Sequence, residues 1–180
     1  MPLPTLITPD DTELYGYSAD IPVALLDRVS ARVRAYSGQQ ITEGTSEVTL
    51  WPPYRLPQRP VREITSVTWD DDTVDADDYT LKPGGYIDID VNGDSITVEY
   101  EHGYTDELPS VLVEFMCSIA ARMNATDDHM SAGVVSESAG GESITWGAEA
   151  YRGVTSLTRE EKATLDRILS LKAPRVVETL

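Results

Sequence analysis

A β-rich segment between two helical patterns constrains the fold of this chain more than any other feature of the sequence. Residues 61–69 and 96–104 are rich in β-branched and aromatic side chains, which favours strands. Four prolines between residues 52 and 60 exclude a continuous helix there. We therefore expect an antiparallel β cassette over residues 46–104.

The clearest local signal in the cassette is the dipeptide Asn92-Gly93. It separates two segments in which apolar and polar residues alternate, and such a pattern is typical of a two-residue type I′ hairpin. The hairpin would fix the pairing of the two flanking strands. The predicted pairs on the apolar side are Ile87 with Val98 and Ile89 with Ile96.

Three amphipathic helices are predicted outside the cassette. The first follows Pro22 and ends at Gly38, and the second opens at Pro109. The third begins with a capping box over residues 158–161 and ends before Pro174. Their apolar stripes comprise Leu26, Val29, Val33 and Tyr36 in the first, Leu112, Phe115, Met116, Ile119 and Met123 in the second, and Leu165, Ile168 and Leu169 in the third.

These patterns predict an α+β protein, namely a small helical bundle of three main helices with an inserted antiparallel β cassette and an extended C-terminal tail. We expect a single domain over residues 1–180, with the cassette at 46–104. An extended loop or arm is predicted at 125–156 and the tail at 173–180. Residues 8–18 are predicted to be a polar loop.

Charge and hydropathy narrow the classes of function. The chain has 31 acidic and 14 basic residues, a net charge of −17, and such a surface repels phosphate. Sequence-specific DNA binding is therefore not expected. No apolar run approaches the roughly 20 residues that span a bilayer, and the N-terminus lacks a signal-peptide pattern, so we expect synthesis in the cytoplasm and no membrane contact. The single cysteine, Cys117, is expected to pack as a small hydrophobic residue.

The sequence contains no recognisable catalytic motif. No nucleophile elbow or phosphate-binding loop occurs, and His102 and His129 are isolated from each other and from Cys117. We therefore predict a protein that is not an enzyme and that has neither a cofactor nor a metal site.

One motif resembles a calcium-binding loop. Asp88, Asp90, Asn92 and Glu99 match the ligand spacing of an EF-hand loop. The flanking segments alternate like strands, however, whereas an EF-hand loop lies between helices. A calcium-dependent surface or carbohydrate-binding module, using this turn and the acidic residues 70–78, is kept as an alternative function.

The order of these elements resembles that of head-to-tail adaptor (connector) proteins of tailed bacteriophages. The resemblance rests on the strand "PVREITSV", the strand "ITVEYEHGY", the proline-started apolar helix that follows, and the later segments "SESAGGESITWG" and "LTREEKATLDRIL". It implies a structural virion protein of the neck that forms a ring, usually a dodecamer, beneath the portal. DNA would pass through the channel without being read. The related neck role of a stopper or head-closure protein is an alternative, but stoppers are dominated by a β-barrel.

The resemblance also suggests which residues bind partners. The tail would dock into the portal protein, through Pro174, Arg175, Val176, Val177 and Leu180. The segment after the second helix would contact the neighbouring subunit, through Val134, Val135, Ile144 and Trp146. A stopper or tail protein is the expected partner on the other side of the ring.

Overall fold

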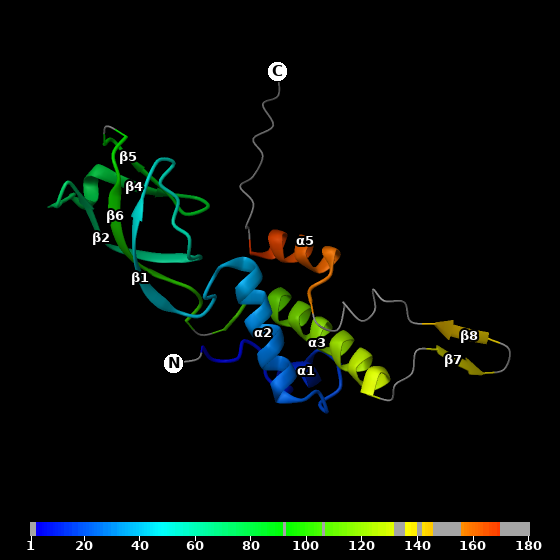
Figure 1. Ribbon diagram of the computed structural model, residues 1–180. Coiled ribbons are helices and arrows are strands. Elements are labelled where there is room, and N and C mark those ends of the chain that lie inside the picture. The colour runs from blue at the N-terminus through cyan, green and yellow to red at the C-terminus, as the bar shows by residue number, and fades with distance from the viewer. Residues whose placement is uncertain are drawn as a thin grey trace, which may run out of the picture. The chain divides into compact units, whose positions relative to one another are not determined.

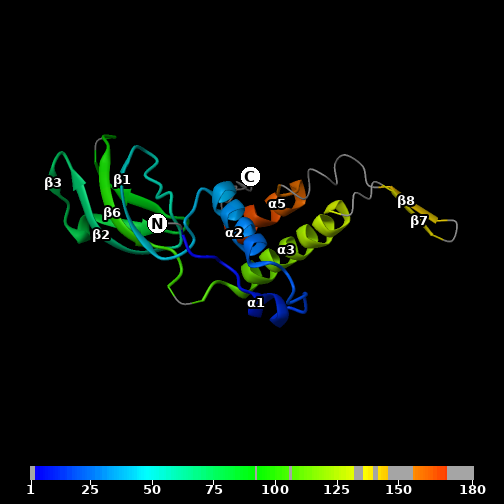
Figure 2. The same ribbon diagram turned by 60° about the horizontal axis from the view of Figure 1, so that its bottom comes forward.

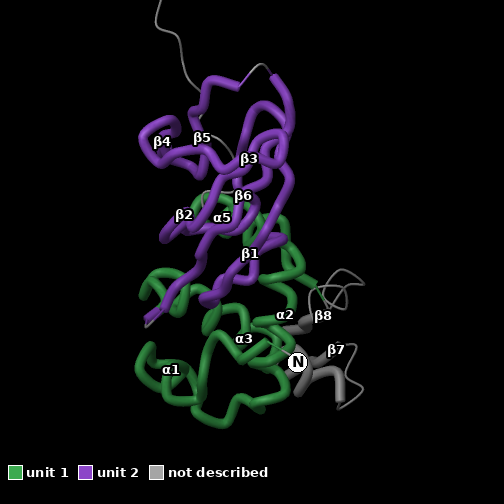
Figure 3. The backbone as a smooth tube through the Cα atoms, turned by 90° about the vertical axis from the view of Figure 1, so that its left-hand side faces the viewer, with its two compact units in different colours: residues 1–36, 108–171 green, residues 37–107, 172–180 purple. Residues whose placement is uncertain are grey.

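The computed structural model describes residues 3–91, 93–105, 107–131, 136–139, 142–145 and 156–169 (Figure 1). The chain divides into two compact units (Figure 3). Residues 1–36 and 108–171 make up the first unit, and residues 37–107 and 172–180 make up the second.

The first unit is mainly helical. Its helices are α1 (Pro9–Leu14), α2 (Val23–Ser37), α3 (Ser110–Ser131) and α5 (Arg159–Ile168), and it also contains the short strands β7 (Ser136–Ala139) and β8 (Glu142–Thr145). Helices α2, α3 and α5 lie side by side in both ribbon views (Figures 1 and 2). The three predicted helices are therefore confirmed, with bounds that differ by a few residues.

The apolar stripes of these helices form the core of the first unit. Burial is complete for Leu26, Val29, Val33, Leu112, Met116, Ile119, Met123 and Leu165. Tyr36, Phe115 and Ile168 are only half-buried. Cys117 is fully buried between these residues, and burial, together with Asp11 and Glu114, raises the pKa of its thiol to about 11. The prediction that this cysteine packs as a small hydrophobic residue is confirmed.

Helix α1 lies where a polar loop was predicted, so that prediction is wrong. Thr8 caps the helix, because its side chain accepts a hydrogen bond from the Asp11 amide while the Asp11 carboxylate accepts one from the Thr8 amide at 2.7 Å. Pro9 presets the first turn. Thr12 is fully buried and donates its hydroxyl to the Pro9 carbonyl, at 2.7 Å. Six residues are too few to show a helical period in a sequence, which explains the error.

The second unit is built from antiparallel strands. Its larger sheet has the order β1-β6-β2-β3, with β1 at Gly44–Leu50, β6 at Ile96–His102, β2 at Val61–Trp69 and β3 at Asp72–Thr73. A smaller sheet pairs β4 (Tyr79–Lys82) with β5 (Tyr86–Ile89), after the 3₁₀ turn η1 (Ala76–Asp78). The core of this unit consists of Leu50, Tyr54, Leu56, Val67, Ile87, Ile96, Val98 and Tyr100.

The predicted pairing across Asn92-Gly93 is wrong. Strand β6 pairs with β1 on one side and β2 on the other, so both of its edges are occupied. Strand β5 pairs with β4 instead, which places Ile87 opposite Leu81 and Ile89 opposite Tyr79. The chain between β5 and β6 therefore connects two different sheets. Strands β1 and β2 are longer than β5, and they pair with β6 in place of a local hairpin.

The predicted fold class, a small helical bundle with an inserted β cassette, is also wrong. The described part of the chain mixes four α-helices with antiparallel sheets. Residues 37–107 form a compact unit of sheets around a hydrophobic core of their own. The second unit buries apolar residues such as Tyr100 and Leu56 in a core of its own, to which the described helices do not contribute. The cassette is therefore not an insertion that depends on the core of a helical bundle. The predicted tail at 173–180 lies outside the described residues.

Among the helices that the structure describes, none combines the length and the apolar character that crossing a membrane requires.

Candidate functional site

Of the residues predicted to bind partners, only Ile144 falls within the described part of the chain. It lies on β8, opposite Glu137 of β7. The other predicted interface residues, Val134, Val135 and Trp146, lie outside the described residues. The same is true of the predicted portal contacts Pro174, Arg175, Val176, Val177 and Leu180.

The hairpin that contains Ile144 forms a sheet of only two strands. Four pairs join it, from Ser136 opposite Thr145 to Ala139 opposite Glu142. Within the described part of the chain, neither strand pairs with a third. The outer edges of β7 and β8 therefore present backbone N–H and C=O groups without a strand partner. A hairpin of this size is at best marginally stable by itself in water, so it is suited to binding another protein surface.

Trp51 is a second feature suited to contact, on the sheet unit. It directly follows β1, and its side chain is 67% exposed, whereas the preceding Leu50 is buried. Exposed tryptophan is enriched at the energetic centres of protein interfaces. The prolines after it remove Trp51 from the strand, and this sequence signal could have identified it. Trp69, in contrast, is partly buried and packs against the core of the sheets.

Among the described residues, the buried His102, together with its neighbour Ser46, has the residue types of a catalytic pair. Its Nε2 lies 2.9 Å from the Ser46 hydroxyl, and its ring centroid lies 5.5 Å from that of Tyr100. Nδ1 has no hydrogen-bond partner among the described residues, and burial lowers the pKa of His102. A serine nucleophile needs a base that a third group orients and that a substrate can approach. His102 is fully buried, so the pair is a contact within the sheet.

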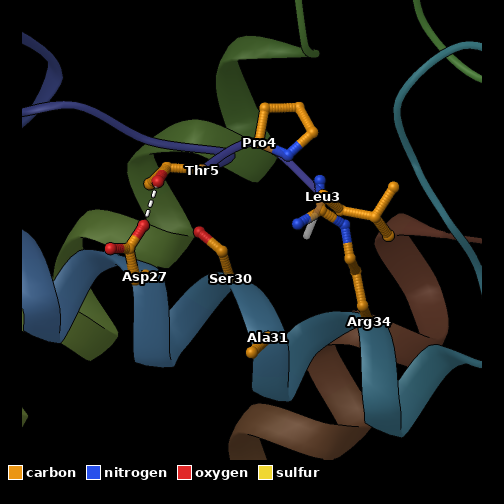
Figure 4. Close-up of a pocket in the computed structure, with 7 residues that line it drawn as sticks. All are labelled: Leu3, Pro4, Thr5, Asp27, Ser30, Ala31 and Arg34. Carbon is orange, nitrogen blue, oxygen red and sulfur yellow. Dashed lines mark hydrogen bonds between the residues drawn. The ribbon is translucent and has the colours of Figure 1, made fainter. Parts of the chain in front are cut away.

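An open cavity of about 710 Å³ lies in the described part of the helical unit (Figure 4). It is lined by Leu3, Pro4, Thr5, Asp27, Ser30, Ala31 and Arg34. The Thr5 hydroxyl donates to the Asp27 carboxylate. The Ser30 hydroxyl accepts from the Leu6 amide at 3.0 Å and donates to the Leu26 carbonyl at 2.9 Å. These polar groups hold the N-terminal segment against α2, and they do not form an acid–base pair.

Two residues of the EF-hand-like motif, Asp88 and Glu99, lie in different sheets. Asp88 lies on β5 and forms an ion pair of 3.3 Å with Lys82, while Glu99 lies on β6 opposite Glu47 and Ser66. Within the described residues, no three His, Cys, Asp or Glu side chains come together in a group that could hold a metal ion. Asp88 and Glu99 therefore lie on strands of two different sheets, without the helix–loop–helix framework of an EF-hand.

Charge is distributed unevenly between the two units. Residues 37–107 contain 16 acidic against 4 basic side chains, a net charge of −12 out of the total of −17. Six aspartates between residues 70 and 78 are all exposed. This unit repels polyanions at short range, and at physiological ionic strength the effect fades beyond about 8 Å.

Comparison with known proteins does not assign a family, since no protein-family model and no curated protein matches the chain.

Proposed function

We propose that this protein is a structural subunit of the neck of a tailed bacteriophage. In this role it is a ring-forming head-to-tail adaptor that joins the portal to the tail side and extends the DNA channel. The observation that carries the proposal is the β7–β8 hairpin, because a single copy leaves both of its edges without a strand partner among the described strands. Such an element is of use to an assembly and is a liability to a monomer.

The charge of the chain suits this role. DNA that moves through a channel must not adhere to the wall, and a subunit with a net charge of −17 repels the phosphate backbone. The acidic sheet unit contributes most of that charge. DNA would therefore pass without sequence-specific binding, and the ring would act by its shape.

The contacts with other neck proteins divide between two regions. The residues from Pro174 onward dock into the portal, since Val176, Val177 and Leu180 can order on a partner and bury apolar atoms there. Trp51 on the sheet unit provides an aromatic anchor for a second protein, such as a stopper or tail protein. In this account the protein is made in the host cytoplasm and resides in the neck of the virion.

The test is cosedimentation of the purified chain with the portal protein of the same phage. We expect the chain to sediment with portal rings. A variant in which a glycine-serine linker of equal length replaces residues 136–145 should keep its helical circular dichroism but lose ring formation. Asp88→Asn, which changes only an exposed ion pair, is the matched control and should assemble normally. Binding to tail-side proteins but not to the portal would instead assign the stopper role, and binding to neither would overturn the proposal.

A further inference from the structure

We propose that neighbouring copies pair their β7–β8 hairpins edge to edge, β8 of one copy with β7 of the next. The hairpins would form a continuous antiparallel sheet around the ring. This inference rests on the proposed ring-forming function and specifies its subunit contact.

The two edges of one hairpin are matched to each other. Strands β7 and β8 each have four residues and pair over their full length. Because they are antiparallel, β8 of one copy also runs antiparallel to β7 of a copy placed beside it in the same orientation. The contact joins two different edges, so it is heterologous and closes into a ring when the rotation between copies allows. No lysine or proline, the residues that commonly protect an open edge, occurs in either strand.

The register of the hairpin favours one alignment between copies. Positions 136, 138, 143 and 145 share one face of the hairpin, and all four are hydroxyl residues. The alternate positions in the register are occupied by Glu137, Ala139, Glu142 and Ile144. Within one hairpin, Glu137 lies opposite Ile144 and Ala139 lies opposite Glu142. When β8 of one copy overlaps fully with β7 of the next, the same residue types are opposite each other between the copies. A slip by two residues can place Glu137 opposite Glu142, and like charges directly opposite each other are destabilising.

The outer edge of β1 is the competing acceptor. Strand β1 pairs only with β6 among the described strands, so its other side also lacks a strand partner. It has seven residues, however, and a four-residue strand would leave part of that edge uncovered. The equal lengths of β7 and β8 favour pairing between hairpins.

The proposal can be tested by disulfide cross-linking between copies. Ser138 and Ser143 are opposite each other in the hairpin, so full overlap also places Ser138 of one copy opposite Ser143 of the next. Residues opposite each other in antiparallel strands have Cα atoms about 4.5–5.5 Å apart, within the range that a disulfide bridges. The native Cys117 is buried and serves as the background control.

Ser138→Cys and Ser143→Cys chains are mixed in equal amounts, assembled with portal rings and oxidised. Random mixing places the required pair at about a quarter of the interfaces of a heterologous ring. We expect covalent dimers from the mixture and none from the wild type or from either variant alone. A Thr49→Cys chain, mixed with the Ser138→Cys chain, tests whether β7 pairs with the outer edge of β1 instead.

Rings that form without the 138–143 cross-link, or with a 138–49 cross-link in its place, overturn edge-to-edge pairing and leave the adaptor function standing. If no ring is visible by negative-stain microscopy, both the pairing and the proposed function fail.

Discussion

Glu161 joins two helices of the first unit and also caps one of them. Its carboxylate accepts two hydrogen bonds from the Arg122 guanidinium on α3, from Nε at 2.8 Å and from Nη2 at 3.0 Å. One of its oxygens also accepts a hydrogen bond from the Thr158 amide at 2.7 Å, which completes the capping box of α5. The Glu161 side chain is only 13% exposed. Glu161→Gln keeps its shape but removes the charge and one acceptor oxygen.

The expected loss of stability follows from these contacts. Hydrogen bonds to a charged group contribute about 1.5–3 kcal/mol, and loss of a cap costs about 1 kcal/mol. The Arg122 side chain is 30% exposed and can turn to water, which lowers the cost of losing the Glu161 charge. We therefore expect Glu161→Gln to reduce the free energy of unfolding by about 2–3 kcal/mol.

The assay is denaturant unfolding followed by helical circular dichroism, because Glu161 supports the helical unit. Asp88→Asn breaks the Lys82–Asp88 ion pair, whose side chains are 52% and 67% exposed, and serves as the control. Exposed ion pairs contribute at most about 1 kcal/mol, so the control should cost much less than Glu161→Gln. Equal losses in the two variants would refute the argument that burial and capping make the Glu161 contacts strong.

Three further predictions concern single residues. Burial lowers the pKa of His102 in the folded chain below the 6.5 of the unfolded chain, so the unfolded chain binds more protons at pH values between these two pKa values. The free energy of unfolding should therefore fall as the pH drops below about 6.5. Denaturant titrations of His102→Gln should no longer show this pH dependence. The Cys117 thiol, with its pKa raised to about 11, should react with a disulfide reagent near pH 8 only after unfolding, and rapid labelling of the native protein would contradict its burial. Gly103 has φ +84°, and a Cβ there would overlap the Thr42 carbonyl, so Gly103→Ala should cost more than about 3 kcal/mol. Gly93→Ala, with φ +81° and open space around it, should cost about 1–2 kcal/mol, and equal costs would disprove the steric account.

The helices could be predicted because their signals are local. The capping box at Thr158 and Glu161 and the apolar stripe of α3 depend on residues three and four apart, and the structure contains both. Strands β2 and β6 were also recognisable from their β-branched residues.

Strand pairing could not be predicted, because it is decided by distant residues. The Asn92-Gly93 turn signal was strong, yet β6 takes its partners from β1 and β2, whose residues lie at least 27 positions away in sequence. The pair of Ser46 and His102 likewise arises only when β1 and β6 align. Pro52 and Pro53 mark the end of the strand before Trp51, but only the structure gives the exposed fraction of its side chain.

Negative-stain electron microscopy of this chain mixed with portal rings of the same phage would show directly whether the protein forms rings on the portal. We expect closed rings of this protein stacked coaxially on the portal, and we expect these rings to be lost when residues 136–145 are replaced by a linker. Bare portals beside monomeric chain at every salt concentration would contradict this expectation.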